Sequence, residues 1–345
     1  MNFSTVKLSK NMTGILEKLL GTDGSTSSGK CPDLPSQIIG SGNLDISFNQ
    51  PYPSFQKKFS QDSSWPPSFD SLSKVYKQYT IENSAGIFHP SLYEKPYQCD
   101  KPDADSTISI IICFRNRAHQ LKLYLTYMIP FLMRQGISFK IYVIEQAGIG
   151  TFNRAKLFNA GFDLIETDNN KNNNPENLFN PGCYFFSDVD LIPENNKNSF
   201  KCDPNKNPKH YTAYIDKWNY KLLYKDIFGG ITQIPPEKFK YVNGYSNKYW
   251  GWGAEDDDMY RRLFKFGKFE LSRSDPILGR MKMISHKREK SNSVNEKRRL
   301  LLNGWRRRML KDGLSDLKYK VVRREDFGVF EKIIVDIGTP WSDPK

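Results

Sequence analysis

The amino-acid sequence predicts an α/β fold, with a mostly parallel sheet flanked by helices. The first observation is Thr107–Phe114, a continuous apolar, β-branched run of strand length that is typical of the middle of a parallel sheet. The second is an amphipathic helical pattern between this run and a second strand at Phe139–Glu145. The third is a further buried strand at Gly182–Pro193. A strand, helix and strand at this spacing predict a βαβ unit with a right-handed crossover.

The remaining elements follow from the same patterns in chain order. The first helix has an apolar face at helical spacing and is expected to close at Gly136; the face comprises Leu121, Tyr124, Leu125, Met128 and Leu132. Later segments predict helices at Thr151–Phe162, Pro235–Val242 and from Trp252 to about Gly267, and strands at Tyr211–Tyr220 and Lys332–Ile337. A tight turn is expected at Gly229-Gly230, and the asparagine-rich stretch Asp168–Pro181 is a predicted loop without an assigned function.

Composition limits the protein classes. The chain has 345 residues, of which 38% are hydrophobic, so it can bury a proper core and is neither disordered nor fibrous. Its net charge of +13 suits a polyanion or a phosphorylated small substrate, but charge bears on association rather than on fold. No run approaches the roughly 20 apolar residues that span a bilayer. Residues 1–30 have too few apolar side chains for a signal peptide, which predicts either a cytosolic protein or an incomplete amino end.

The chain divides into three parts by composition. Residues 1–30 are expected to form a stem-like segment, and residues 31–102 a loop-rich lead-in, rich in Ser, Pro, Asn and Lys, that is the N-terminal part of the same domain as the residues after it. The organised fold is expected over residues 103–345. The basic stretch Lys287–Arg308 could bind a polyanion, but such stretches are more often solvated helix faces or mobile loops. No recognised nucleic-acid-binding module accompanies it, so we expect no nucleic-acid partner.

The sequence around Tyr249–Leu263 (YWGWGAEDDDMYRRL) is the strongest local signal. Four consecutive acids, Glu255 to Asp258, follow tryptophans that are interleaved with glycines. One interpretation is a helix with an acidic first turn, because carboxylates are stabilised at the positive end of the helix dipole. An ordered helix start does not need an indole on a flexible backbone, however. A mobile aromatic ring beside carboxylates is typical of a sugar-binding site.

A second acidic motif, Asp188-Val189-Asp190, lies at the end of the predicted third strand. Ligands bind at the carboxyl ends of strands in open α/β sheets. Two carboxylates on the same side of a strand could hold a divalent cation that in turn holds a diphosphate. The alternative is an ordinary capped strand end. The motif alone is weak evidence for a metal site.

Together these motifs resemble the β-1,4-galactosyltransferase family (glycosyltransferase family 7). The matching segments run in order over roughly Cys31 to Pro340: FRNR (114–117), FNRAKL (152–157), FSDVDLIP (186–193), FGG (228–230), NGYSNKYWGWGAEDDD (243–258) and VDIGTP (335–340). The resemblance implies a GT-A fold, a single Rossmann-like catalytic domain that binds a UDP-sugar and Mn²⁺. It also implies a mobile lid near residues 284–305 that folds over the bound donor.

The resemblance assigns roles to individual residues. The implied metal ligands are Asp190, Met283 and His286. Sequence reasoning alone would not choose Met283, because Mn²⁺ prefers oxygen to a thioether. The implied UDP-sugar ligands, which include a tryptophan that closes over the donor phosphates, are Phe114, Arg115, Asn116, Arg117, Phe152, Asn153, Arg154, Asp188, Val189, Ile227 and Trp252. Guanidinium and amide groups are suited to phosphate and uracil.

The implied reaction is a single displacement that inverts the anomeric carbon of the donor sugar. Asp256 matches the general base that takes a proton from the 4-hydroxyl of a terminal GlcNAc. The implied acceptor-binding residues, besides Asp256, are Gly253, Ala254, Glu255, Asp257 and Arg298. A second hypothesis is a sugar-binding relative that has lost catalysis, but the acid, metal and base positions all match the family.

The donor sugar is predicted from Ile227. Vertebrate galactosyltransferases of the family carry tyrosine at this position, whereas invertebrate members that transfer GalNAc carry isoleucine or another smaller residue. A tyrosine ring would crowd the acetamido group on C2 of the sugar, and isoleucine leaves room for it. We therefore expect UDP-GalNAc as the donor, with UDP-Gal as the alternative.

Five cysteines leave at least one thiol free, and the absence of CxxC spacing argues against zinc. The resemblance implies two disulfides, Cys31 with Cys99 and Cys183 with Cys202, and leaves Cys113 unpaired where the family usually has proline. Disulfides require an oxidising compartment. Members of the family are type II membrane proteins of the Golgi, so the expected location is the Golgi lumen, with the membrane anchor missing or truncated in this chain.

Overall fold

The structure is a computed structural model. It describes residues 87–88, 107–135, 137–171, 180–195, 197–286, 292–328 and 330–342. The predicted stem, most of the loop-rich lead-in and the predicted helix end at Gly136 lie outside these residues. In the part of the chain that the structure describes, none of the helices combines the length and apolar character needed to cross a membrane.

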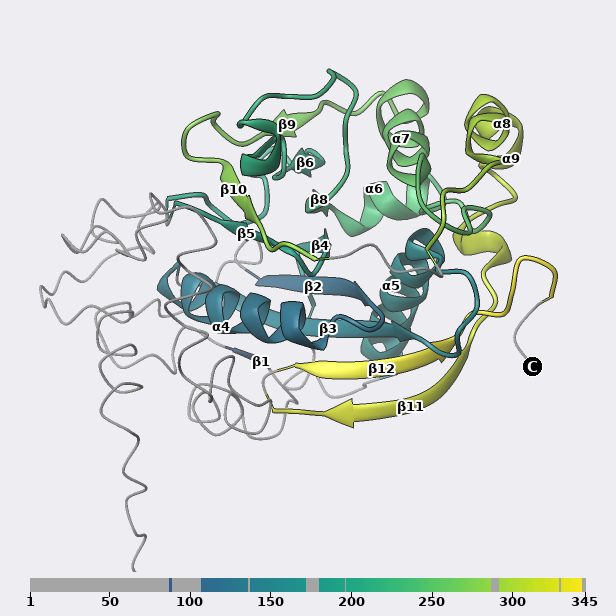
Figure 1. The fold of residues 1–345 in the computed structure, drawn as a ribbon, viewed down its shortest axis with the longest axis horizontal. Coiled ribbons are helices and arrows are strands. Elements are labelled where there is room, and N and C mark those ends of the chain that lie inside the picture. The colour runs from purple at the N-terminus through teal and green to yellow at the C-terminus, as the bar shows by residue number, and fades with distance from the viewer. Residues whose placement is uncertain are drawn as a thin grey trace, which may run out of the picture.

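A large mixed sheet forms the centre of the molecule, with strands in the order β11-β12-β3-β2-β4-β8-β6-β9 (Figure 1). Its middle is parallel and consists of β12 (Glu331–Asp336), β3 (Ser138–Gln146), β2 (Thr107–Phe114) and β4 (Cys183–Ser187). Antiparallel strands flank this middle, with β11 against β12 and β8 against β4. The predicted parallel βαβ unit is therefore confirmed.

The remaining described strands are short. They are β1 (Ile87–Phe88), β5 (Leu191–Pro193), β6 (Lys209–His210), β7 (Tyr214–Ile215), β8 (Thr232–Ile234), β9 (Ser272–Arg273), β10 (Arg280–Met283) and β11 (Lys320–Asp326). The helices are α4 (Ala118–Arg134), α5 (Arg154–Lys171), α6 (Pro236–Tyr241), α7 (Glu255–Tyr260), α8 (Arg298–Asn303) and α9 (Trp305–Arg308). A π-helical turn, Arg261–Phe266, continues α7, so the acidic helix runs to Gly267 as predicted.

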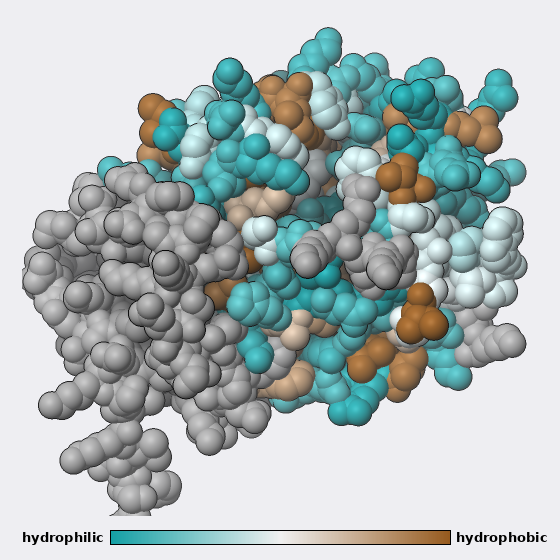
Figure 2. All heavy atoms as spheres, in the orientation of Figure 1, coloured by the Kyte–Doolittle hydropathy of each residue, from teal (hydrophilic) through white to brown (hydrophobic). Residues whose placement is uncertain are grey.

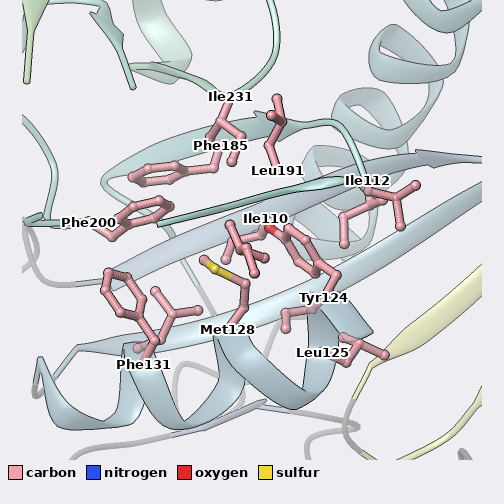
Figure 3. Packing of buried hydrophobic residues seen from close by; sticks show 14 of the residues in the cluster. Ile110, Ile112, Tyr124, Leu125, Met128, Phe131, Phe185, Leu191, Phe200 and Ile231 are labelled. Carbon is pink, nitrogen blue, oxygen red and sulfur yellow. The ribbon is translucent and has the colours of Figure 1, made fainter. Parts of the chain in front are cut away.

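The two faces of β2 bury separate apolar clusters. Ile108, Ile110 and Ile112 pack in the cluster that includes α4, where Figure 3 shows Tyr124 and Met128 beneath Ile110 and Ile112. Ile111 and Cys113 pack in the cluster that includes α5. Side chains alternate between faces along a strand, so a strand buried on both faces must be apolar throughout. This is why the continuous apolar run predicted a central strand.

Two sequence predictions are wrong in detail. The predicted strand Tyr211–Tyr220 is reduced to β7, followed by a 3₁₀ turn at Asp216–Trp218. The predicted strand Gly182–Pro193 ends at Ser187, and Asp188-Val189-Asp190 forms a turn between β4 and β5. The two carboxylates are therefore not held on one side of a strand. Apolar and polar residues alternate in FSDVDLIP as they do in a single half-buried strand, so the sequence pattern did not indicate the turn.

A second, three-stranded sheet, β5-β10-β7, lies beyond the end of β4. Its register places Met283 opposite Leu191, directly after Asp190. The small sheet therefore joins two segments that are far apart in sequence and that carry predicted metal ligands.

On the coloured part of the face drawn in Figure 2, apolar side chains are scattered among hydrophilic ones rather than gathered into one broad patch.

Candidate active site

A cavity of about 430 Å³ lies where the parallel strands end. It is lined by residues from several elements, which bring most of the predicted site together. They are Cys113, Arg115, Arg117, Phe152, Arg154, Asp188, Val189, Asp190, Leu191, Thr212, Ile215, Lys217, Trp218, Ile227, Gly229, Gly230, Trp252, Glu255, Asp256, Met283, His286 and Asn292. Its polar lining is dominated by carboxylates and guanidinium groups, which suits an ionic ligand.

Arg154, the first residue of α5, links three parts of the cavity wall. Its Nε donates to Asp188 Oδ1 at 2.6 Å, and its Nη2 donates to the carbonyl of Gly230 at 3.0 Å. Its Nη1 lies 3.6 Å from Glu255 Oε1. One guanidinium group therefore fixes the turn after β4, the glycine turn and the start of α7 relative to one another.

The predicted metal ligands converge on the small sheet. His286 Nε2 lies 2.8 Å from Asp190 Oδ2, and the amide of Ile284 donates to the carbonyl of Asp190 at 2.7 Å. Met283 lines the cavity beside them. Burial raises the pKa of Asp188. The positive charge of Arg154 opposes this effect, and the negative charge of Asp190 adds to it. Two carboxylates in one cavity favour a cation.

Asp216 holds the strand that carries Met283. Its Oδ1 accepts from the amide of Met283 at 2.9 Å, and its Oδ2 lies 2.8 Å from Lys282 Nζ.

Within the described residues no three His, Cys, Asp or Glu side chains form a metal-binding group. The candidate donor set needs the Met283 thioether in addition to Asp190 and His286. A hard oxygen, an imidazole nitrogen and a thioether can hold a divalent transition metal, with water or substrate oxygens in the remaining positions.

The glycine-tryptophan stretch takes a conformation that few other sequences could adopt. Gly251, Gly253 and Ala254 have φ angles of 87°, 112° and 72°, and Ala254 immediately precedes α7. Left-handed backbone is strained for a residue with a Cβ atom, so the glycines are required here. Trp252, between them, is 51% exposed and lines the cavity. The sequence thus presents one indole ring at the mouth of the site.

The tryptophan loop is attached to the basic segment predicted as a lid. The amide of Trp252 donates to the carbonyl of Ser293 at 2.8 Å, and the amide of Asn295 donates to the carbonyl of Trp252 at 3.0 Å. A Cβ atom at Gly253 would lie 3.0 Å from Arg298 Cδ, so the arginine side chain packs directly on this glycine. Residues 287–291 of the segment lie outside the described structure.

The four acids of the motif have different surroundings. Glu255 and Asp256 line the cavity, and Asp257 Oδ1 accepts from the Tyr224 hydroxyl at 2.9 Å. Asp258 points away from the cavity and is fully buried. The charge pattern alone could not separate these residues, whereas the family resemblance assigned roles to Glu255, Asp256 and Asp257 and gave none to Asp258.

Glu255 is a buried carboxyl group and Asp256 a half-buried one, whose Oδ1 accepts from the amide of Asp257 at 3.0 Å. Burial raises the pKa of Glu255 to about 7, with the charge of Asp256 adding to the effect and Arg154 opposing it. The Oε2 atom of Glu255 is buried, and the described residues offer it no hydrogen-bond partner. Burial also raises the pKa of Asp256, with Asp257 as the next cause. A carboxylate with a raised pKa is a better proton acceptor.

Asp258 belongs to a separate group of buried charges, which we call the Arg262 cluster: Tyr249, Asp258, Arg262, Arg308 and Asp312. Asp258 Oδ1 accepts from Arg262 Nε at 2.7 Å, and its Oδ2 accepts from Tyr249 Oη at 2.9 Å and from Arg308 Nη2 at 3.0 Å. Arg262 Nη1 donates to the carbonyls of Gly244 and Asp312. This cluster fastens α7 to the segment after α9.

The predicted nucleotide-binding residues divide into two groups. Arg115, Arg117 and Phe152 line the cavity, and Arg115 Cζ lies 5.0 Å from the centre of the Phe152 ring. Asn153 is fully buried instead; its side chain accepts from the amide of Lys156 at 2.9 Å and donates to a backbone carbonyl. Asn153 therefore caps the start of α5.

Several predicted site residues do not line the cavity. These are Phe114, Asn116, Asn153, Gly253, Ala254, Asp257 and Arg298. Their roles in binding stay predictions. Conversely, sequence reasoning missed Thr212, Ile215, Lys217 and Trp218, which do line it. They lie on or beside β7 and its 3₁₀ turn, in the region where a longer strand was expected, and no local motif marks them.

The cysteines follow the predicted pattern where they are described. Cys183 and Cys202 form a disulfide with Cα atoms 5.7 Å apart. Cys113 is a free, buried thiol that donates to the carbonyl of Arg154 at 3.2 Å, and its pKa is raised by burial. The predicted pair Cys31 and Cys99 lies outside the described residues.

Two family models match this chain. The N-terminal region of glycosyl transferase group 7 matches residues 67–203, and the N-terminal domain of galactosyltransferase matches residues 209–287. Bovine (Bos taurus) β-1,4-galactosyltransferase 1 is 41% identical over 245 residues, which are 71% of this chain and 57% of the relative. The chain thus spans a little over half the length of that relative. Hamster (Cricetulus griseus) β-1,4-galactosyltransferase 2 is 34% identical over 313 residues, which are 90% of this chain and 73% of the relative.

Solved structures agree with the sequence comparisons. The catalytic domain of Drosophila β-1,4-galactosyltransferase 7, in complex with xylobiose, has a TM-score of 0.55 and 27% identity, and the match covers 69% of this chain and 99% of that one. A mutant of the Drosophila enzyme, solved with manganese, UDP-Gal and xylobiose, matches equally well. This likeness confirms the predicted GT-A fold. The chain belongs to the glycosyltransferase group 7 family, the family of the β-1,4-galactosyltransferases.

Proposed function

We propose that this protein is an inverting, metal-dependent glycosyltransferase that moves GalNAc from UDP-GalNAc to the 4-hydroxyl of terminal GlcNAc on glycoconjugates. The observation that carries the proposal is one cavity that joins Asp190, Met283 and His286 to Asp256 and Trp252. A candidate cation site, a candidate base and an aromatic ring therefore face the same space. A sugar nucleotide and a sugar hydroxyl could meet there.

Asp190, Met283 and His286 would hold Mn²⁺, which the Drosophila relative binds together with UDP-Gal. The bound ion supplies Lewis-acid stabilisation of the negative charge that develops on the departing UDP. Arg115 and Arg117 line the cavity and would contact the phosphates or the uracil. Arg154 neutralises Asp188 and keeps the wall of the donor site in place.

In the proposed reaction, the bond from the anomeric carbon to UDP breaks while a bond to the acceptor O4 forms on the opposite face. The O4 proton passes to the Asp256 carboxylate. Burial raises the pKa of this group, which favours proton acceptance. Glu255, Asp257 and Arg298 would hold the acceptor sugar. Alignment of the two reactants can itself be worth about 7 to 11 kcal/mol.

The donor sugar is the finer part of the proposal. Ile227 lines the cavity and is 7% exposed, so its side chain limits the space available to a bound sugar. Isoleucine is smaller than tyrosine and leaves an apolar gap for the acetamido methyl of GalNAc. UDP-Gal is the second candidate, because the relatives named above are galactosyltransferases. A catalytically silent sugar-binding protein is the third.

The donor is tested by kcat/KM for UDP-GalNAc and UDP-Gal with Mn²⁺ and a GlcNAc-terminated acceptor. We expect a preference for UDP-GalNAc, and Ile227→Tyr should shift the ratio towards galactose by depressing GalNAc transfer. One methyl-sized contact is worth about 1 to 3 kcal/mol, so a shift of about 10-fold or more is expected. Ile227→Val is the matched control that adds no bulk. A wild type that prefers UDP-Gal refutes the GalNAc donor, and no transfer from either donor favours the silent relative.

The cation is tested with the same assay. Activity should be lost in excess EDTA and return with Mn²⁺. Asp190→Ala and His286→Ala should each raise the Mn²⁺ concentration needed for half-activation, because each removes a proposed ligand. Isothermal calorimetry of Mn²⁺ binding gives a readout that does not depend on turnover. Full activity in EDTA would contradict the metal-dependent reaction.

The Golgi lumen is the proposed location. The Cys183–Cys202 disulfide supports an oxidising compartment. Localisation of the full-length gene product with a Golgi marker tests this.

A further inference from the structure

The glycine turn Phe228–Gly230 forms the surface on which the Asp256 carboxylate rests. A Cβ atom built on Gly229 would lie only 2.4 Å from Asp256 Oδ2. No side chain separates the carboxylate from the turn, so the carboxylate touches the peptide backbone itself. Any displacement of this turn would therefore change the space that Asp256 occupies.

Two buried side chains, at the end of β6 and two residues after it, hold the turn through one carbonyl group. The Gly229 carbonyl accepts from Thr212 Oγ1 at 2.6 Å and from His210 Nε2 at 3.0 Å. Thr212 Oγ1 also accepts from the amide of Ile231 at 3.0 Å, so this hydroxyl is bonded to the residue before Gly230 and to the residue after it. His210 is 0% exposed, and Thr212, which lines the cavity, is only 1% exposed, so solvent has little access to these bonds.

The protonation state of His210 determines which of its ring nitrogens can donate to the turn. Burial and the nearby Arg273 lower the pKa of His210 to about 3, so the ring is neutral at physiological pH. A neutral ring has one N–H group, and a bond to the Gly229 carbonyl requires that it is Nε2–H. The Gly229 carbonyl can only accept, so the single hydroxyl proton of Thr212 is used on it, while the hydroxyl oxygen accepts from the amide of Ile231 and lies 3.2 Å from His210 Nε2. Both donors therefore serve the turn.

We infer that Thr212 and His210 are positioning residues for Asp256: their bonds to the Gly229 carbonyl fix the turn against which the proposed base is aligned. The inference rests on the proposed function, because it assumes that Asp256 accepts the acceptor proton. The alternative is that the two side chains merely satisfy buried polar groups. In that case their loss would lower stability without a specific effect on turnover.

Thr212→Val and Thr212→Ser form a matched pair. Valine keeps the shape but removes the hydroxyl, whereas serine keeps the hydroxyl and removes a methyl. We expect Thr212→Val to lower kcat by about 10- to 100-fold, since a small displacement of a catalytic group can cost about 100-fold. KM for the UDP-sugar and the half-activating Mn²⁺ concentration should stay within about 2-fold. Thr212→Ser should recover most of kcat, measured well below the melting temperature of each variant.

His210 offers an independent pair. The amide of His210→Gln can donate to the same carbonyl and should retain more kcat than His210→Leu, which cannot donate. This pair carries the test if Thr212→Val does not fold.

The outcomes separate the two hypotheses. A wild type without transferase activity overturns the proposed function, and with it this inference. An active wild type with a normal kcat in Thr212→Val, or an equal loss in Thr212→Ser, overturns the inference alone. Equal losses of kcat and of UDP binding would also overturn it, because they would indicate a general structural defect.

Discussion

Asp256 and Asp258 lie two residues apart in one helix, yet their carboxylates have opposite surroundings. Asp258 is bonded to Arg262, Arg308 and the Tyr249 hydroxyl. Asp256 is half-buried and faces the cavity beside Glu255; it accepts only from the backbone amide of Asp257, at 3.0 Å, among the bonds that the described residues show, and its pKa is raised. Nothing in the EDDD run distinguishes the two aspartates.

The difference shows that burial of a charge does not by itself indicate function. A buried carboxylate that is fully paired contributes to the fold, because its partners replace the water it has lost. A buried carboxylate without enough partners raises the free energy of the folded state, and such a group is retained where its reactivity is useful. The comparison can be tested by removing the charge of each of these carboxylates in turn.

The largest effect is expected at Asp256. Asp256→Asn keeps the size of the side chain but cannot accept a proton, so transfer should fall by about 10²- to 10⁴-fold. UDP-sugar binding and the free energy of unfolding should be unchanged or slightly increased, since one of several neighbouring negative charges is lost. Steady-state kinetics with calorimetric UDP binding check this. Near-normal turnover would show that another group is the base.

The opposite result is expected at Asp258. Asp258→Ala leaves the guanidinium of Arg262 buried with a lost partner, and breaking a buried ion pair typically costs about 3 to 5 kcal/mol. Urea denaturation should show this loss, while kcat per folded molecule changes far less than in Asp256→Asn. If Asp258→Ala unfolds the protein, Arg308→Lys is the milder variant of the same cluster. A stable but inactive Asp258→Ala protein would erase the distinction between the two aspartates.

A smaller effect is expected at Glu255, and it depends on pH. Its pKa is raised by burial to about 7, from the ordinary value of 4.5, so the folded protein binds this proton more tightly than the unfolded chain does. Its contribution to stability is therefore complete below about pH 4.5 and is lost as the pH rises through 7. Glu255→Gln should flatten this part of the stability curve, measured by urea denaturation of the metal-free protein. An unchanged slope would show that Glu255 is already ionised at low pH.

Much of the fold could be predicted because apolar runs specify strands directly. β2, β3 and β12 lie where their sequences indicate, and α4 and α6 follow their apolar spacing. Edge strand β11 was missed, since its run KVVRRED is largely charged and solvent-facing. Helix α5 extends to Lys171, beyond the predicted end at Phe162, because its second half is stabilised by contacts rather than by a clear pattern.

The site was less accessible to sequence reasoning. Asp190 and His286 are 96 positions apart, and only the register of β5 against β10 places them together. Met283 is indicated as a ligand only by the family resemblance, because Mn²⁺ prefers oxygen to a thioether. His210 and Thr212 act through a backbone carbonyl, for which sequence carries no signal. Contacts of this kind depend on tertiary structure, whereas strands depend on local pattern.

The order of these residues along the chain has a consequence for biosynthesis. Arg154 is made before Asp188, and the Cys183–Cys202 disulfide encloses Asp188 and Asp190 in a loop with a sequence separation of 19. The ribosome therefore makes Asp188, Asp190 and the neutralising Arg154 before it reaches the acidic helix or His286. His286 and Asn292 are the last lining residues to be made, so Asp190 and His286 can meet only late in synthesis.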